Sequence, residues 1–339
     1  MLQHTLNPAA RAQLDAFIAD LETKVAAQPG PASPVSTLLT VLESYVPDAP
    51  KIGNYTNCQR QLAGQVTEED MSVFALPADA LAERLAQWQA VLDAHQIKAN
   101  CAVQQAFRGD CKFISPKGAT CDLRMSLFDA EGVIPEFCVS CYKVQILTHD
   151  VIALIRLHFI MRHMELPKDN YRKCMIELRQ DVPNPYKGYI YCTSEEEAGL
   201  CLNTMQAAIA SAGITGIECR LSHGCSEYSL KYPEFKYSED GSHKSFARPE
   251  GWDRKEAQFF AANRDAGAVR TDYNNHGMSV RDLLCFRTWL EYAELIGDTT
   301  CELFDASLRT TGDEAFAAQV KAQAEQRQRE WVKLNEVTA

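Results

Sequence analysis

The sequence predicts an α+β protein in which a helical N-terminal region and a cysteine-rich metal-binding insert precede a mixed sheet flanked by helices. Two observations lead to this class. Apolar residues recur at helical spacing through most of the first 100 residues. Beyond residue 173, three short stretches alternate apolar and polar residues, and a long helical pattern separates the second from the third. Such a β-β-α-β order suits a ferredoxin-like sheet with a helix on one face.

The N-terminal region, residues 1–100, is expected to contain three helices. Asn7 and Pro8 form an N-cap and a first helical residue, and apolar residues at helical spacing follow them. A break rich in Pro, Gly and Ser separates this helix from a short one at residues 35–45. A third amphipathic helix is expected at residues 79–97.

The middle segment, residues 101–147, is the cysteine-rich one, and turn-forming residues are interspersed among its cysteines. Two alternating stretches, at residues 121–128 and 142–147, are expected to be short strands. The rest of the segment is expected to be irregular.

The C-terminal part, residues 148–339, is expected to form one α+β domain. It contains a long aromatic loop at residues 223–252 that lacks convincing periodicity. Its last helix is polar with a sparse apolar stripe, so it is expected to be solvated or to pack on a partner, including a second copy of the chain. The expected elements are a helix at 151–164 capped by Thr148 or Asp150, strands at 174–179 and 188–192, a helix at 194–212, a strand at 214–223, and helices at 253–264, 279–297 and 312–335.

Charge narrows the class of partner. Lys and Arg number 34 against 45 Asp and Glu, which gives a net charge of −11 at neutral pH. Binding to nucleic-acid phosphates or to an anionic membrane needs a basic surface, so this balance argues against both. No export signal opens the sequence, and no apolar run approaches the roughly 20 residues of a membrane span. The expected partner is a small molecule or a protein, and the expected location is the cytoplasm.

The 13 cysteines need an explanation. An odd count in a long chain without an export signal argues against a disulfide framework. The remaining roles are buried apolar thiols, metal ligands and a reactive thiolate. His158, inside the apolar helix, is expected to be an ordinary core histidine. Core thiols are expected at inward strand positions and inside helices, namely at Cys174, Cys192, Cys201, Cys219 and Cys285.

The strongest signal for chemistry is Cys138-Val139-Ser140-Cys141, a Cys-x2-Cys knuckle between a loop and a strand. That spacing lets two thiolates face one ion. Two further cysteines lie upstream, in segments punctuated by Gly and Pro where no pattern makes them natural core thiols. The sequence therefore predicts a four-cysteine metal site made of Cys111, Cys121, Cys138 and Cys141.

The metal in this site and one of its ligands are left open by the sequence. Four thiolates hold Zn²⁺ or fill the ligand set of an iron–sulfur cluster, and a single knuckle with two isolated cysteines does not decide between them. Cys101 is an alternative to Cys111 as a ligand. The competing interpretation is that these are free thiols in an irregular segment.

A second group of candidate residues surrounds the strand end at Ser222-His223-Gly224-Cys225. A thiol after a glycine turn can be exposed, and a neighbouring histidine can lower its pKa. The pattern Ile-Glu-x-Arg occurs in two strands, which places its charges on outward faces. These charges are explained by cross-strand ion pairs or, alternatively, by the floor of an anion site. The predicted catalytic residues are Cys225, His223, Glu177, Arg179 and Arg220.

Several enzyme classes lose support because their motifs are absent. The sequence has no P-loop, no Gly-x-Gly-x2-Gly, no Gly-x-Ser-x-Gly and no His-Glu-x2-His. The preferred function is a metalloprotein with a mainly structural zinc or iron–sulfur site that binds or transforms a small anionic substrate. A thiol-dependent or metal-associated transferase or hydrolase would fit this description. The alternative is a non-catalytic assembly factor that binds a partner through its C-terminal helix.

Overall fold

The structure is a computed structural model, and most of the residues that it describes lie between residues 74 and 310. The first two predicted N-terminal helices and nearly all of the polar C-terminal helix lie outside the described residues. The third predicted helix is confirmed as α4 (Ala78–Ala94). The structure describes residues 58, 61–62, 74–95, 97, 108–112, 121–168, 170–178, 182, 184–235, 246–263, 279–310, 320–321 and 324–325.

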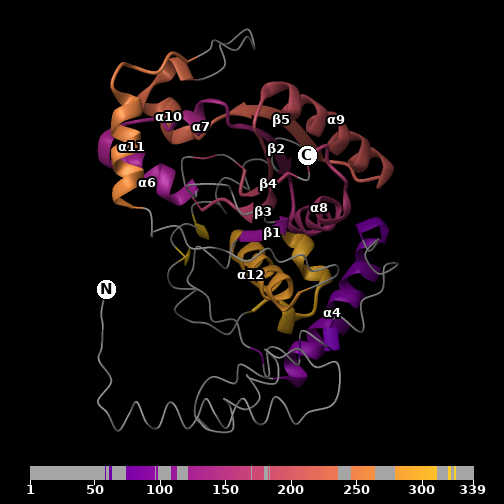
Figure 1. The fold of residues 1–339 in the computed structure, drawn as a ribbon. Coiled ribbons are helices and arrows are strands. Elements are labelled where there is room, and N and C mark those ends of the chain that lie inside the picture. The colour runs from indigo at the N-terminus through magenta and orange to yellow at the C-terminus, as the bar shows by residue number, and fades with distance from the viewer. Residues whose placement is uncertain are drawn as a thin grey trace, which may run out of the picture.

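Five strands form one sheet with the order β1-β3-β4-β2-β5, and every neighbouring pair is antiparallel (Figure 1). The predicted α+β class is confirmed, whereas the predicted mixed sheet is wrong. Alternation of apolar and polar residues indicates a strand but not its direction, because the period of two is the same in both kinds of pairing. The strands are β1 (Arg108–Lys112), β2 (Tyr142–Thr148), β3 (Arg172–Ile176), β4 (Tyr186–Cys192) and β5 (Ile217–His223).

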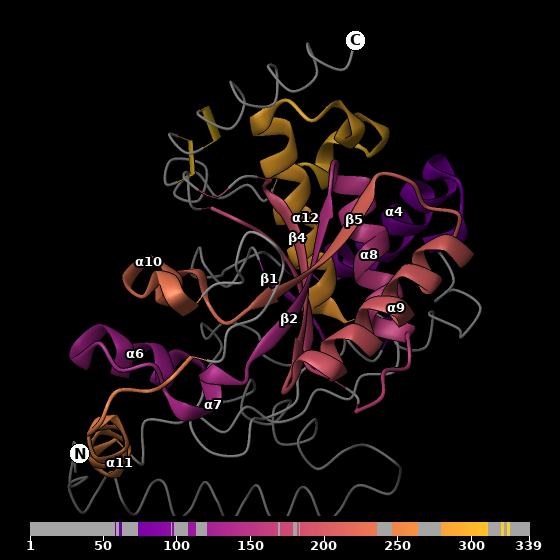
Figure 2. The ribbon, with the colours of Figure 1, turned by 90° about the horizontal axis from the view of Figure 1, so that it is seen from above.

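Two helices cover one face of the sheet. α8 (Val151–His163) packs on β1, β3 and β4, and α9 (Glu195–Ser211) packs on β2, β4 and β5 (Figure 2). Both begin where the sequence predicts, because the side chains of Asp150 and Ser194 accept hydrogen bonds from backbone amides in the first turn. The burial of nearly every residue of α8 explains why its sequence is apolar on all sides.

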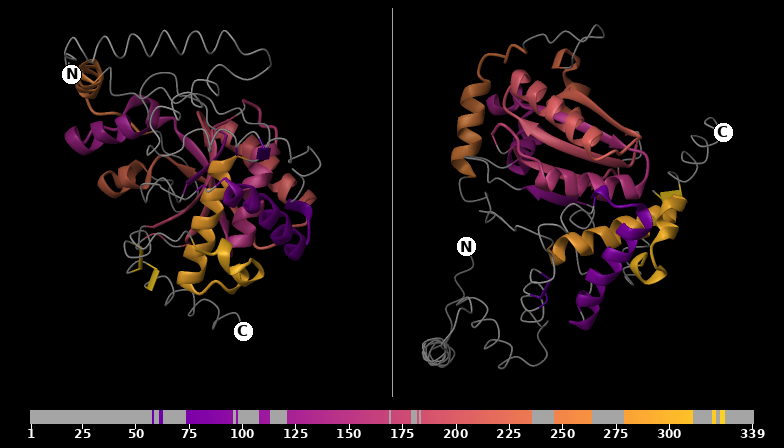
Figure 3. Two further views of the ribbon diagram at one scale, coloured as in Figure 1. Left: turned by 90° about the horizontal axis from the view of Figure 1, so that it is seen from below. Right: turned by 90° about the vertical axis from the view of Figure 1, so that its right-hand side faces the viewer.

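The main hydrophobic core continues beyond α8 into two further helices. α12 (Val280–Ile296) contacts α4, α8 and the edge strand β1 (Figure 3). Trp88, Phe159 and Trp289 come from α4, α8 and α12, and each is almost fully buried in this core. None of the helices in the described ranges combines the length and apolar character needed to cross a membrane.

A second hydrophobic cluster lies at the end of the sheet where β2 begins and β5 ends (Figure 1). It is built around α6 (Cys121–Glu131), α7 (Glu136–Val139), α10 (Ser226–Lys231) and α11 (Trp252–Ala262). A short 3-10 helix at Pro233–Phe235 belongs to the same region, and two others, Thr299–Leu303 and Ala306–Leu308, follow α12. We call this second hydrophobic cluster the aromatic cluster, and its buried members are Leu127, Phe128, Val133, Ile134, Cys138, Tyr228, Phe235, Phe246 and Trp252.

Two local predictions are wrong in this region. Residues 121–128, expected to be a strand, belong to α6, where the buried Arg124, Leu127 and Phe128 recur three and four residues apart as on one helix face. Residues 223–252 are not one structureless loop, because they contain α10 and a 3-10 helix. Helices of only one or two turns are too short to show a period in the sequence.

Candidate metal centre

The edge strand β1 brings Cys111 beside Cys174 of β3. The two strands pair with Gly109 opposite Cys174, and their register shifts between Asp110 and Lys112. An irregularity of this kind changes the direction of a side chain along a strand. The Cys111 sulfur lies 3.8 Å from the Cys174 sulfur, although 63 residues separate the two cysteines in the sequence.

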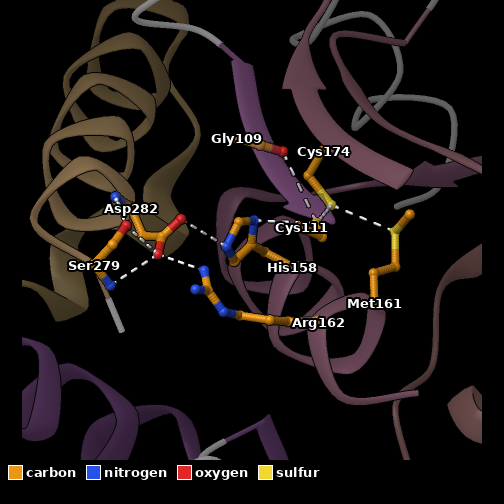
Figure 4. A network of polar contacts seen from close by, with 8 residues as sticks. All are labelled: Gly109, Cys111, His158, Met161, Arg162, Cys174, Ser279 and Asp282. Atoms are coloured by element: carbon orange, nitrogen blue, oxygen red, sulfur yellow. Dashed lines mark hydrogen bonds and ion pairs between the residues drawn. The ribbon is translucent and has the colours of Figure 1, made fainter. Parts of the chain in front are cut away.

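α8 supplies further side chains to the same place. His158, Met161 and Arg162 lie three and four positions apart, so they project from one face of the helix. His158 Nδ1 is 3.3 Å from Cys111 Sγ, and Met161 Sδ is 3.6 Å from Cys174 Sγ (Figure 4). One helix face therefore presents a nitrogen and a sulfur to the two thiols.

Gly109 permits β1 to approach α8 this closely. A Cβ atom at this position would lie 3.0 Å from His158 Nδ1 and 3.2 Å from the ring of Trp289. Both neighbours are fully buried, so neither has free space into which to move. The His158 ring can therefore lie beside the two thiols only because Gly109 has no side chain.

The geometry of these donors matches that of a metal site. Cys111 Sγ, His158 Nδ1 and Cys174 Sγ all lie within 4.8 Å of one another. Two sulfurs bound to one zinc ion at about 2.3 Å form a tetrahedral edge of about 3.8 Å, which is the sulfur–sulfur distance observed. Cys111 is 7% exposed, and His158 and Cys174 have no exposed surface. This part of the chain therefore holds a Cys-His-Cys cluster that could bind a metal.

A carboxylate supports His158 on the far side of its ring. Asp282 Oδ1 lies 3.3 Å from His158 Nε2, which is an ion-pair contact rather than an aligned hydrogen bond. Asp282 Oδ2 pairs with Arg162 and accepts hydrogen bonds from the amide and the hydroxyl of Ser279 (Figure 4). A carboxylate behind a histidine is the usual support for a metal ligand, because it orients the ring and raises the basicity of the nitrogen.

The pKa shifts of Cys111 and His158 favour a thiolate–imidazolium pair in the metal-free protein. Burial by itself raises the pKa of Cys111, but the hydrogen bond from Cys174 and the charge of His158 outweigh it and lower that pKa from 9.0 to about 5. Burial by itself lowers the pKa of His158, but the Cys111 thiolate and Asp282 raise it from 6.5 to about 9. Burial keeps Cys174 a neutral thiol by raising its pKa well above 9.0.

Asp282 and Arg162 add a second balanced pair to the site. Burial by itself raises the pKa of Asp282, yet the neighbouring Arg162 and His158 hold that pKa well below its usual range. The metal-free site at neutral pH therefore carries two positive and two negative charges in direct contact. Such pairing is what allows charged side chains to be buried.

The thiolate–imidazolium pair is expected to make the stability of the metal-free protein depend on pH. The contribution of Cys111 is present above its unfolded pKa of 9.0 and is lost as pH falls through about 5. The contribution of His158 is present below its unfolded pKa of 6.5 and is lost as pH rises through about 9. Between pH 6.5 and 9 the contribution of Cys111 rises with pH while that of His158 falls, so the two changes cancel. Between pH 5 and 6.5 these two residues bind one proton more in the unfolded chain than in the folded protein, so stability falls as pH falls.

We therefore expect the free energy of unfolding to fall by about 1.5 kcal/mol between pH 7 and pH 5 because of this pair. Urea unfolding at the two pH values, in the presence of a chelator, measures the loss. The matched variant is Cys111→Ala, in which the loss should be much smaller. An equal pH dependence in the two proteins would show that Cys111 is not a thiolate.

The four cysteines predicted as one metal site are divided between the two hydrophobic clusters. Cys111 lies in the main core, whereas Cys138 lies in the aromatic cluster. Cys141 directly precedes β2 and is partly buried, and Cys121 is the exposed first residue of α6. Cys101, the alternative ligand, lies outside the described residues.

Two of the predicted catalytic residues lie next to the aromatic cluster. His223 is buried, with Nδ1 2.9 Å from the Phe235 carbonyl and Nε2 2.7 Å from the Val139 carbonyl. Cys225 is the N-cap of α10, and burial raises its pKa above the usual value. A reactive thiol needs the opposite shift, so this geometry supports a structural role for both residues.

The predicted charged face is spread across the sheet. Glu177 is buried just after β3, whereas Arg220 is exposed on β5 and donates a hydrogen bond to Gln145 at 3.0 Å. Two strands, β4 and β2, separate β3 from β5. Arg179 lies outside the described residues. The structure therefore does not bring Glu177 and Arg220 together.

Three residues of the metal-site candidate carried no functional prediction. Cys174 and His158 were expected to be core residues, and Asp282 lies in the helix predicted at residues 279–297. Their burial is confirmed, but burial alone does not describe their contacts. One sequence signal was available, because His158 and Arg162 are polar residues four positions apart on one face of a mostly apolar helix.

Comparisons of the chain with models of known protein families, with curated proteins and with solved structures found no match. The functional argument therefore rests on the geometry of the site.

Proposed function

We propose that the protein is a metalloprotein in which Cys111, His158 and Cys174 hold one zinc ion. The observation that carries this proposal is the convergence of two sulfurs and one imidazole nitrogen within 4.8 Å of one another in the buried core. The carboxylate of Asp282 behind the imidazole supports it. Met161 Sδ is a further soft donor at the same place.

Charge favours a divalent ion. Binding would displace one proton from the Cys174 thiol and one from His158 Nδ1, because both must be deprotonated to act as ligands. A Zn²⁺ ion with two thiolates is then neutral, and the Asp282–Arg162 pair stays balanced. Copper(I), which soft sulfur ligands also select, would leave an unpaired negative charge in the core. Zinc is therefore the expected metal, and copper is the alternative outcome of metal analysis.

Metal analysis of purified variants tests the proposal. Cys111→Ser and Cys174→Ser are each expected to lower the zinc content by about one equivalent per chain relative to the wild type, since removal of one thiolate opens the site. The matched control is Cys301→Ser, which changes an equally buried thiol in the 3-10 helix Thr299–Leu303. The control should keep its zinc.

A second measurement protects the test against variants that do not fold. Wild-type protein substituted with cobalt is expected to show thiolate charge-transfer absorbance that is weaker in Cys111→Ser but unchanged in Cys301→Ser. Wild-type protein that contains no metal after purification, and takes up none on dialysis against zinc, would refute the proposal.

Thiol catalysis is a second candidate function for the same residues. The specific observation in its favour is a Cys111 thiolate with a pKa of about 5, next to an imidazolium that a carboxylate supports. The low exposure of Cys111, 7%, speaks against it, because a nucleophile needs access to its substrate. Rapid and selective alkylation of Cys111 at pH 6 in metal-free protein would favour this candidate over the metal site.

A ferredoxin-like arrangement is supported by the order of elements in the sheet domain. The chain runs β2-α8-β3-β4-α9-β5, and these strands lie in the spatial order β3-β4-β2-β5. Both helices pack on the sheet, as the β-α-β-β-α-β motif requires. On this interpretation β1, which carries Cys111, is an extra strand added beside β3.

A cytoplasmic location is supported by the state of the thiols. The cysteines in the described part of the chain are free, as expected in a reducing compartment. A small anionic substrate, and partner binding or self-association through residues 312–335, remain predictions of the sequence.

A further inference from the structure

The Cys138–Cys141 knuckle lies between α7 and β2, in the aromatic cluster rather than in the main core. The Cys141 amide donates a hydrogen bond of 3.3 Å to the Cys138 carbonyl, which closes the turn between the two residues. A turn of this kind lets both sulfurs of a Cys-x2-Cys pair face one ion. The zinc ion proposed for Cys111 makes no use of this pair.

Sheet pairing carries Cys225 to the same turn. The first residue of β2 lies opposite His223 at the end of β5, and the Gly224 amide donates a 2.7 Å hydrogen bond to the Cys141 carbonyl. His223 Nε2 lies 2.7 Å from the Val139 carbonyl inside the knuckle. The strand end is thus joined to the knuckle backbone at two points. Cys225, which follows Gly224, packs on the aromatic cluster, and this cluster also contains Cys138.

α6 brings a fourth sulfur to this end of the sheet. Cys121 is the first residue of α6. Further along the helix, Phe128 packs edge-on against Tyr228 of α10, with ring centroids 4.7 Å apart. α6 therefore lies against the helix that begins directly after Cys225.

The pKa shifts of these thiols agree with the proximity that the backbone contacts establish. Burial is the main cause that raises the pKa of Cys138 to about 12, and the charges of Cys225 and Cys121 raise it further. The pKa of Cys141 is also raised to about 12, first by burial and then by Cys225, with smaller contributions from Cys138 and Cys121. The Tyr228 hydroxyl donates a 3.4 Å hydrogen bond to Cys138 Sγ, which opposes this rise because it stabilises the thiolate.

Isolated core thiols in the same protein behave differently. Burial alone raises the pKa of Cys58 and of Cys219 to about 11, and no other cysteine contributes to either shift. The thiols around the knuckle therefore differ from these isolated ones, because they lie close enough to influence one another's ionisation. A cation bound among the sulfurs would favour their deprotonation, and zinc and iron are metals that thiolate ligands select.

We propose that Cys121, Cys138, Cys141 and Cys225 form a second metal site, a four-thiolate centre that binds a zinc ion or an iron–sulfur cluster. Among the described residues, only the Cys111 group has three donor atoms within 4.8 Å of one another. The four sulfurs of the second site are farther apart than this, so the metal must draw them together. Rotation of a cysteine about its Cα–Cβ bond moves the sulfur by about 3 Å without any change in the backbone. The side chains can therefore close the site while the knuckle and the strand end stay in place.

Protection from alkylation tests the second site in the wild-type chain. Full-length protein, purified without oxygen, is treated with iodoacetamide before and after removal of metal by a chelator, and each labelled cysteine is identified by mass spectrometry. The four cysteines are expected to label at least about tenfold faster after chelation, because metal-bound thiolates are not free nucleophiles. Equal labelling rates with and without chelator at these positions would overturn the proposal.

Metal analysis of one variant pair separates the two sites and identifies the metal. Cys225→Ser is expected to lose the metal of the second site, whereas Cys219→Ser, which changes a partly buried thiol near the start of β5, should keep it. Zinc without sulfide indicates a zinc site, and iron with acid-labile sulfide and visible absorbance indicates a cluster. Metal lost on Cys111→Ser, with no loss of zinc or iron on Cys225→Ser, would sustain only the first site. The reverse result would sustain only the second.

Discussion

Replacing Asp282 with alanine is expected to lower the free energy of unfolding by about 3–5 kcal/mol, because the change removes the carboxylate that balances a buried positive charge. The Arg162 side chain is only 8% exposed and pairs with Asp282. The carboxylate also caps α12, since Ser279 donates to it from both its amide and its hydroxyl. Loss of the cap adds to the loss of the ion pair. Chemical denaturation of metal-free protein measures the change.

Asp253→Ala is the matched control for this prediction. Asp253 also forms an ion pair, with Arg248, but its side chain is 87% exposed. A pair in water contributes less than about 1 kcal/mol. The intermediate variant Asp282→Asn keeps a capping oxygen while removing the charge, so its effect should lie between the two. If Asp282→Ala were no more destabilising than Asp253→Ala, Asp282 would not be a buried support for His158.

Replacing Gly224 with alanine is the second change for which a large effect is expected. Gly224 has φ of 58°, and a Cβ atom would lie 2.1 Å from Cε1 of Phe235. Phe235 is 1% exposed and is packed between the rings of His223 and Tyr228, so it cannot move aside. Backbone strain of about 1–3 kcal/mol and overpacking of a similar size should together destabilise the protein by about 3 kcal/mol or more.

Gly213→Ala separates the two causes of this effect. Gly213 also has a positive φ, of 65°, but a Cβ atom there would meet nothing within 4 Å. Its cost should therefore be the backbone strain alone, about 1 kcal/mol. Thermal or chemical unfolding of the two variants gives the comparison, and similar losses in both would show that Phe235 yields to the new side chain.

Local patterns in the sequence were sufficient to place most of the sheet domain. The capping residues Asp150, Ser194 and Ser279 mark helix starts that the structure confirms. They succeed because a cap is a contact between residues three positions apart. The prediction for residues 121–128 fails because most apolar and polar residues alternate along this run, whereas the buried residues of α6 lie three and four positions apart on one helix face.

The candidate metal sites show the same difference between local sequence patterns and contacts of distant residues. The knuckle and the strand end at His223 could be recognised because each is a short run of residues, and both lie in the proposed second site. The partners that complete them are not neighbours in the sequence. Cys225 meets the knuckle only because β5 pairs with β2.

By itself, the sequence determined that this is an acidic α+β protein, and it determined where its helices in the sheet domain begin. Tertiary structure alone decided which thiols meet. Cys111, His158 and Cys174 converge because β1 pairs with β3 and α8 packs across both strands. The physical reason is that strand pairing and helix packing depend on contacts between distant segments, whereas patterns of capping and periodicity report only on residues within a few positions of one another.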